Sequence, residues 1–339
     1  MRVAVMGAHD GHVNGMIANA LQAPNVEMVG IVEPDDAHYA RVSRRVELPR
    51  FPSLEAMIDE ARPQLILEGL NHAEKTHLVT TAARHGIHLL LDKPLCRTLT
   101  DWSLMREAVV ASGIKLSMWF TSRSYAPFVR LREYIEQGAL GDLVSFVSTH
   151  PHKLGPSSPA WYYDPAVYTG VFHDLACHGV DQIRWLAGAE FTGVSALSSS
   201  VREHPGPLAD HVQASFSLAN GSAAVVTADW LTPQGSPSFG DTRFIIMGTK
   251  GSAHLRAYAG NHVLIVSDTF GTIEPTFDDV RPRPFVEEMV RHIERGEEHF
   301  ISTDDVFAVA KACLVAEESA RQGGRLLPID STSHGPALG

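Results

Sequence analysis

The stretch that decides the fold is RVAVMGAHDGHVNGMIANALQAPNVEMVGIVE, residues 2–33. It opens with a short apolar run that ends in Gly7, continues with a helix-like segment over 12–22, and closes with a second apolar run over 26–32. A strand, a helix and a second strand in this order are typical of a nucleotide-binding fold. Glu33 follows the second strand, about 20 residues after the turn, where such folds place an acidic side chain that binds the adenosine ribose hydroxyls.

The same alternation continues beyond this stretch. Helix-like segments separate further strand-like runs over 64–68, 87–91 and 115–120. Strands that alternate with helices predict a parallel sheet covered by helices. We therefore expect an α/β dinucleotide-binding domain over residues 1–121.

The pattern changes after residue 121. Longer runs of alternating apolar and polar residues follow, with hairpin signals such as Asn220-Gly221 between them, over 193–197, 210–218, 222–230, 242–248, 252–257 and 262–267. Such runs predict a largely antiparallel open sheet. We expect an α+β second domain over 122–330, whose last helix is able to pack back on the first domain, and a flexible tail over 331–339.

The turn after the first strand departs from the usual G-x-G-x-x-G/A fingerprint of dinucleotide sites. It reads GAHDGH, so that His9 stands at the second glycine position and His12 at the third. Gly7 and Gly11 still predict a tight turn that leads into a helix, with the pyrophosphate at the helix N-terminus. We expect Gly7, His9, Gly11 and His12 to contact a cofactor, with weakened cofactor binding as the alternative.

A second candidate group follows the strand-like run at 87–91. It reads Asp92-Lys93-Pro94. Ligands of open parallel sheets bind outside the carboxyl ends of the strands. Lys93 is therefore expected to point into the crevice, with Asp92 orienting its ammonium group.

The stretch TGVFHDLACHGVDQIRWLAG, residues 169–188, carries a third group. Its apolar residues gather on one side at helical spacing, which predicts one amphipathic helix. Asp174 and His178 stand one turn apart at the edge of that face. A surface ion pair is the plain interpretation of this pair; a catalytic pair is the other.

Composition limits the class of partner. The chain has 339 residues, 44% of them hydrophobic, and a formal net charge of −11. Acidic balance without a dense run of Lys and Arg argues against nucleic acid and anionic membranes, and favours a small polar molecule. The sequence predicts a cytoplasmic location for three reasons. Its three cysteines are scattered, no apolar run reaches the roughly 18 residues of a membrane span, and its start looks unlike a signal peptide.

Four stretches of the sequence resemble the glucose-fructose oxidoreductase and inositol dehydrogenase family of nicotinamide-dependent dehydrogenases. LLLDKPL is similar to the family's Glu-Lys-Pro motif, and the helical pattern with Gly170, Asp174, His178 and Trp185 is similar to its second-domain motif. The resemblance covers nearly the whole chain and rests on residues 89–95, 120–142, 170–188 and 246–255.

This resemblance implies a Rossmann domain that binds NAD(H) or NADP(H), and a second domain whose sheet supplies substrate contacts and an interface for a dimer or tetramer. It also implies hydride transfer to or from a secondary alcohol of a sugar, an inositol or a related substrate. His178 is then the general base, Lys93 stabilises alkoxide charge beside the cofactor, and Asp174 orients His178 or a substrate hydroxyl. Glu33 favours NAD(H), because its charge repels a 2′-phosphate.

Further side chains are candidates for substrate contacts. Arg123 follows from the resemblance, and Tyr163 lies in the aromatic loop before the motif. His150, His152 and His173 are expected to hydrogen-bond a polar substrate. Together with Asp174 and His178 these histidines also suggest a metal-dependent enzyme, although we expect no metal. A nucleotide-binding sensor without turnover is the remaining alternative.

Overall fold

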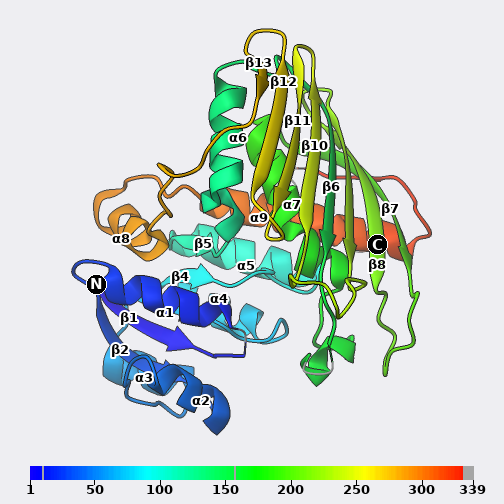
Figure 1. Ribbon diagram of the computed structural model, residues 1–339. Helices are drawn as coiled ribbons and strands as arrows, with labels where there is room; N and C mark the ends of the chain where they lie inside the picture. The colour runs from blue at the N-terminus through cyan, green and yellow to red at the C-terminus, as the bar shows by residue number, and fades with distance from the viewer. Residues whose placement is uncertain (10, 156–157, 331–339) are drawn as a thin grey trace. The chain divides into compact units, whose positions relative to one another are not determined.

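The computed structural model describes residues 1–9, 11–155 and 158–330. The chain divides into two compact units (Figure 1). Met1–Phe120 and Arg283–Phe307 form the first, and Thr121–Pro282 with the chain from Ala308 onward forms the second. The tail expected over 331–339 lies outside the described residues.

The first unit contains a parallel sheet in the order β2-β1-β3-β4-β5. Its strands are β1 (Arg2–Met6), β2 (Glu27–Val32), β3 (Leu65–Glu68), β4 (His88–Leu91) and β5 (Leu116–Met118). Its helices are α1 (His12–Gln22), α2 (Asp36–Ser43), α3 (Leu54–Ala61), α4 (Lys75–Arg84), α5 (Leu99–Ser112) and α8 (Phe285–Arg295). The α/β fold expected from the alternation is confirmed.

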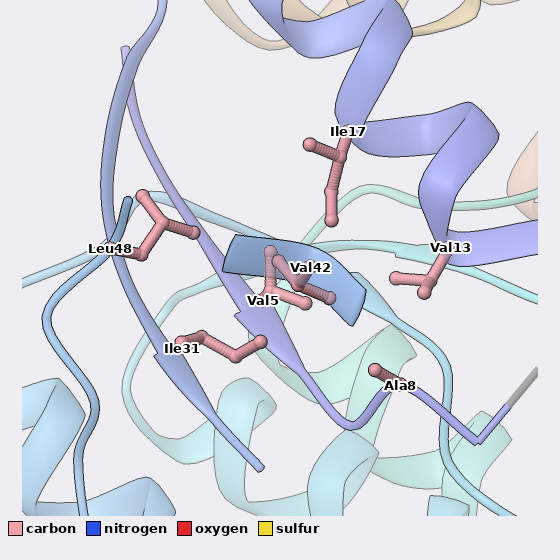
Figure 2. Close-up of a cluster of buried hydrophobic side chains, with 7 residues drawn as sticks. All are labelled: Val5, Ala8, Val13, Ile17, Ile31, Val42 and Leu48. Atoms are coloured by element: carbon pink, nitrogen blue, oxygen red, sulfur yellow. The ribbon is translucent and has the colours of Figure 1, made fainter. Parts of the chain in front are cut away.

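A hydrophobic cluster holds the first strand-helix-strand unit together (Figure 2). It joins Val5 of β1, Val13 and Ile17 of α1 and Ile31 of β2, and also includes Ala8, Val42 and Leu48. All seven side chains are buried, so the apolar periodicity of residues 2–33 becomes one packed core. This core fixes α1 against the carboxyl ends of β1 and β2.

The segment 283–307 lies apart in sequence but belongs to the first unit. Helix α8 packs against α1, where the Val286 backbone N–H donates to Asn19 Oδ1 at 2.8 Å. The Phe285 ring lies 4.5 Å from that of Trp119. The sequence predicts this segment within the second domain, and the structure corrects that prediction. An amphipathic helix does not reveal which core buries its apolar face.

The second unit is built on a sheet in the order β13-β12-β11-β10-β6-β9-β8-β7-β14. Its strands are β6 (Leu143–Pro151), β7 (Phe191–Ser199), β8 (His211–Leu218), β9 (Ala223–Asp229), β10 (Thr242–Gly248), β11 (Gly251–Ala257), β12 (His262–Ser267), β13 (Gly271–Ile273) and β14 (Leu327–Pro328). The sheet is mostly antiparallel, as expected, with one parallel pair, β6 and β9. The hairpin predicted at Asn220-Gly221 joins β8 to β9.

Helices cover one face of this sheet. They include α6 (Ala126–Glu136) and α7 (Cys177–Ala187), together with α9 (Thr303–Arg321), whose first turn belongs to the first unit. Side chains that alternate along the strands leave Val147, Ile245, Met247 and Val266 exposed on the other face. Among the described residues, no helix combines the length and apolar character needed to cross a membrane.

The stretch predicted as one helix over 169–188 is not a single α-helix. A π-helical turn, Phe172–Ala176, precedes α7, and α7 ends at Gly188 in the left-handed conformation. A π-turn uses wider hydrogen-bonded loops than an α-helix, so residues before and after it do not keep regular α-helical spacing. Asp174 lies within this π-turn and His178 in the first turn of α7, so the two residues are joined by a wider turn than the regular α-helical one expected.

Candidate functional site

The chain turns tightly at Gly7, between β1 and the segment that leads to α1. Gly7 adopts a positive φ of 76°, and a Cβ built on it would lie 2.6 Å from Leu70 Cδ2. Its N–H donates to the Val32 carbonyl at 2.9 Å, which turns the chain between β1 and β2. Helix α1 begins at His12, and its N-cap Gly11 has no side chain that could cap the first N–H groups. Backbone N–H groups at such a helix N-terminus suit the pyrophosphate of a dinucleotide.

Glu33 directly follows β2, and its side chain is buried against the glycine turn. Its Oε2 accepts a hydrogen bond from the Ala8 N–H at 2.6 Å, and its Oε1 accepts one from the Asp35 N–H at 2.9 Å. The carboxylate thus ties the glycine turn to the segment that follows β2. A ribose hydroxyl would share these oxygens with two backbone donors.

Two histidines and an arginine surround Glu33. The rings of His9 and His38 lie 5.1 Å apart, and Arg41 donates to the Ala8 carbonyl. Among the described residues, His9, Glu33 and His38 form the one group with three potential metal-ligand atoms within 4.8 Å of one another. In the part of the chain that the structure describes, the alternative metal cluster of His150, His152 and His173 with Asp174 and His178 is not such a group.

A network of charged groups lies at the carboxyl end of β4. Asp92 is buried, and its two oxygens lie 3.1 and 3.2 Å from Nδ1 of His12 at the start of α1. Asp92 Oδ1 also accepts the Lys93 backbone N–H at 2.7 Å. Burial acts to raise the pKa of Asp92, but the charges of His12, Lys75 and Lys93 outweigh burial and hold the pKa below its ordinary value. Asp92 is therefore a buried carboxylate.

Beneath this network lies a buried ion pair. Lys75 of α4 places its Nζ 3.1 Å from Glu68 Oε2 and donates to the Asp92 carbonyl at 2.6 Å. Glu68 Oε2 also accepts the Asp92 N–H at 3.0 Å, which joins the ends of β3 and β4. Burial raises the pKa of Glu68 to about 7, against the lowering effect of Lys75. The strand end that carries Lys93 is thus fixed by charged groups rather than by apolar packing alone.

The π-turn of the second unit positions Asp174. Tyr168 Oη donates to Asp174 Oδ2 at 2.9 Å and accepts a hydrogen bond from Trp230 Nε1 at 3.1 Å. Burial raises the pKa of Tyr168 well above its ordinary value, and the Asp174 charge adds to this effect. The Tyr168 phenol therefore stays protonated and remains a hydrogen-bond donor to Asp174. The side chain of His178, by comparison, is only partly buried.

A buried carboxylate from α9 holds the start of the same segment. Glu317 Oε1 accepts the backbone N–H groups of Phe172 at 2.9 Å and of His173 at 3.3 Å. Burial raises the pKa of Glu317 to about 6. Gly170 adopts a φ of 121°, and a Cβ there would lie 2.4 Å from Glu317 Oε1. Only glycine fits this position, which gives a physical reason for the first residue of the Gly170 motif.

Two of the expected substrate contacts are buried in the second unit. Arg123 forms a two-point ion pair with Asp181, at 2.8 Å from Nε and 2.6 Å from Nη2. His150 is buried against Gly179, where a Cβ would lie 2.0 Å from its Nε2, and burial lowers the pKa of His150 to about 3. Its imidazole is therefore neutral.

The other three expected contacts lie around the π-turn and the aromatic loop. His173 is buried, with its Nδ1 3.2 Å from Thr169 Oγ1. His152 is partly buried, and its ring lies 5.2 Å from that of Phe239. Tyr163 is also partly buried and stacks on His204 at 5.9 Å. Of the five candidates, His152 and Tyr163 retain exposed surface for a ligand.

Sequence reasoning missed the residues that support these sites. Glu68 stands at a strand end directly before Gly69, a signal of the same kind as Asp92-Lys93. Lys75, Tyr168 and Glu317 carry no such signal in the sequence. The role of each depends on which distant residues its helix or loop contacts in the folded chain.

Comparisons with known proteins agree with this geometry. The family described as "Oxidoreductase family, NAD-binding Rossmann fold" matches residues 1–120, and "GFO/IDH/MocA C-terminal domain" matches residues 128–254. The chain therefore belongs to the Gfo/Idh/MocA oxidoreductase family. The resemblance identified from sequence is confirmed, and residues 1–120 form the Rossmann domain of a nicotinamide-dependent oxidoreductase.

Individual relatives share a modest fraction of identical residues with this chain. Levoglucosan dehydrogenase of Pseudarthrobacter phenanthrenivorans is 34% identical over 139 residues, which span 40% of this chain and 35% of that relative. D-xylose 1-dehydrogenase (NADP(+)) 2 of Haloferax volcanii is 23% identical over 95% of this chain and 98% of its own length. A levoglucosan dehydrogenase solved in complex with NADH and L-sorbose superposes with a TM-score of 0.83 at 22% identity, covering 98% of this chain and 99% of the other.

Proposed function

We propose that this protein is an NAD(P)-dependent dehydrogenase that transfers a hydride between the cofactor and a secondary alcohol or ketone of a sugar, an inositol or a related polyhydroxylated molecule. The observation that carries the proposal is Lys93, which follows a buried carboxylate at the carboxyl end of β4 within an NAD-binding domain. Ligands of this fold bind at that edge. The related levoglucosan and xylose dehydrogenases support a carbohydrate substrate.

Each catalytic side chain has one task in this proposal. His178 removes the hydroxyl proton as general base, and Lys93 donates a hydrogen bond to the same oxygen and stabilises its developing negative charge. Asp174, oriented by Tyr168, holds His178 or a neighbouring substrate hydroxyl. His152 and Tyr163 contribute substrate contacts from the surface, while Arg123, His150 and His173 act through the segments they hold in place.

The cofactor is the hydride acceptor in this reaction, and we propose NAD(H) over NADP(H). Gly7, Gly11 and the start of α1 fit its pyrophosphate, with His9 and His12 alongside. Glu33 supports NAD(H), because a buried carboxylate at the end of β2 repels a 2′-phosphate. Arg41 and His38 lie close enough to offset part of that repulsion, so the preference is expected to be moderate.

We also propose that the second-unit sheet forms the interface of a homo-oligomer, a dimer or tetramer. The open face carries exposed apolar side chains on neighbouring strands, including Val147 paired with Ile245. Exposed apolar patches of this kind favour association. Light scattering coupled to size exclusion would give the mass, and Ile245→Lys should shift an oligomer toward monomer.

Cofactor titration and a substrate screen test the enzymatic proposal. NADH and NADPH would be titrated by fluorescence, and sugars and polyols would then be screened for cofactor reduction. The variant His178→Asn should lower turnover by about 10²- to 10⁴-fold, the usual contribution of a general base, while NADH affinity stays near that of the native protein. His262→Asn is a matched control, because this exposed histidine lies on β12 of the same unit.

The outcomes separate the competing hypotheses. Tight NADH binding without turnover of any substrate would support a nucleotide sensor. Absence of binding to either nucleotide would contradict the dehydrogenase proposal. A large loss of NADH affinity in His178→Asn would contradict the role of His178 as a base.

A further inference from the structure

His12 occupies an unusual position for a basic residue. It is the first residue of α1, whose first turn contains no acidic side chain and whose N-cap makes no side-chain hydrogen bond. Positive charge at a helix N-terminus opposes the helix dipole. An imidazolium at this place is therefore unfavourable on its own and becomes favourable when an anion lies beside it.

The partner of His12 determines which ring nitrogen carries a proton. Asp92 is an ionised, buried carboxylate, and an ionised carboxylate only accepts hydrogen bonds. At 3.1 Å from Asp92 Oδ1, Nδ1 of His12 must therefore be the donor. A carboxylate at this distance also stabilises the imidazolium, because a buried charge is costly without a charged or hydrogen-bonded partner.

The burial of the two partners differs strongly. The Asp92 side chain is 3% exposed, whereas the His12 side chain is 45% exposed. One edge of the imidazole is thus held by the protein interior while a large part of the ring faces solvent at the start of α1. The pair thus combines a buried carboxylate with a partly exposed imidazole.

His12 also replaces a glycine whose usual purpose is packing. The third glycine of the fingerprint allows the helix to approach the strand closely. Close approach is provided elsewhere here: a Cβ on Gly69 would lie 2.9 Å from Val13 Cβ, and one on Gly15 would lie 3.3 Å from Trp119. The position of His12 is therefore available for a group that interacts with a ligand.

We propose that His12 and Asp92 form an imidazolium–carboxylate pair that binds the pyrophosphate of the dinucleotide cofactor and replaces part of the missing glycine fingerprint. This inference rests on the proposed nicotinamide cofactor and extends it. The pair also links the phosphate loop to the strand end that carries Lys93, because Asp92 Oδ1 accepts both the His12 ring and the Lys93 N–H.

Binding of cofactor fragments tests this proposal without turnover. ADP-ribose contains the pyrophosphate, whereas adenosine does not. In calorimetric titrations, His12→Asn should weaken ADP-ribose binding by about 10- to 100-fold, the effect of removing one charge-assisted hydrogen bond. Adenosine affinity should stay within about 2-fold, and ADP-ribose affinity should depend less steeply on salt than in the native protein.

Two further variants separate charge from folding. His12→Lys retains a cation and should recover part of the ADP-ribose affinity. His77→Asn removes an exposed histidine from α4 of the same unit and should change neither affinity. Thermal melts would establish that each variant is folded. We expect the His12 variants to fold, because the His12 side chain is partly exposed.

The results have distinct meanings. Native-like ADP-ribose binding by folded His12→Asn would overturn the role of the pair. Equal weakening of ADP-ribose and adenosine would also overturn it, because the loss would then not reside in the pyrophosphate. If the native protein binds neither ADP-ribose nor NADH, the proposed cofactor itself fails, and the inference fails with it.

Discussion

Each unit contains a buried ion pair, and the two pairs differ in how the cation is held. In the second unit, Arg123 makes a two-point contact with Asp181 through a planar guanidinium. In the first unit, Lys75 approaches one oxygen of Glu68 and shares its ammonium with the Asp92 carbonyl. Arginine stays charged and binds a carboxylate with a rigid fork, whereas lysine is a flexible point charge.

This difference matches the location of each pair. The Arg123 pair joins the segment after residue 120 to α7 within the second unit. The Glu68–Lys75 pair lies directly under Asp92, and Glu68 has a pKa of about 7. A permanent ion pair holds structure, whereas a carboxyl group that titrates near neutrality adjusts its charge when its surroundings change.

The largest expected effect is the loss of the two-point pair. Arg123→Met leaves Asp181 buried without its cation, so the free energy of unfolding should fall by about 4 to 5 kcal/mol. Urea denaturation would measure this change. Arg243→Met is the control: its exposed pair with Asp241 should contribute less than about 1 kcal/mol. A loss no larger than that of the control would show that the pair does not stabilise the fold.

A smaller loss is expected for the one-point pair, and it should depend on pH. Lys75→Met should reduce the free energy of unfolding by about 3 kcal/mol at pH 8, because Glu68 loses its cation. Glu68 already has a folded pKa near 7, above its ordinary 4.5, so protonation relieves the penalty at low pH. The loss should therefore be smaller at pH 5 than at pH 8, by urea denaturation at both values.

The double variant Lys75→Met/Glu68→Gln tests the same explanation. It removes the titrating group, so its stability relative to the native protein should vary less with pH than that of Lys75→Met. An equal loss for Lys75→Met at both pH values would contradict the idea that Glu68 adjusts its charge.

Much of the fold follows from the sequence. The alternation over residues 2–33 predicts β1, α1 and β2, because the apolar periods of strand and helix differ clearly. Alternating runs likewise predict the antiparallel sheet. The place of α8 in the first unit was not predictable in this way, since it depends on contacts with Asn19 and Trp119 far away in sequence.

The sequence indicated which residues belong to the candidate sites, but not which residues they contact. The fingerprint comparison identifies His12 as unusual, yet its partner Asp92 lies 80 positions away. Helical spacing suggested a pairing of Asp174 and His178, but it could not reveal the π-turn that carries Asp174 or the hydrogen bond that Tyr168 donates to Asp174. Residue type also could not reveal that the imidazole of His150 is buried against Gly179.

The smallest expected effect concerns Glu317, a buried carboxyl group that accepts hydrogen bonds from two backbone N–H groups. Glu317 has a folded pKa of about 6, above its ordinary 4.5. It therefore stabilises the fold fully below pH 4.5, and this contribution is lost as the pH rises through 6, by about 2 kcal/mol in total. Glu317→Gln keeps an acceptor for the Phe172 and His173 N–H groups but does not titrate.

The difference in unfolding free energy between the native protein and Glu317→Gln should consequently fall by about 2 kcal/mol between pH 4.5 and pH 7. Glu318→Gln is the matched control: hydrogen bonds from Gln322 and Arg321 lower the pKa of this neighbouring carboxyl, so its contribution is lost in the opposite direction, as the pH falls. If the difference in unfolding free energy between the native protein and Glu317→Gln does not change with pH, the two backbone donors compensate for the burial of Glu317. A carboxylate held by backbone N–H groups would then behave like one held by a cation.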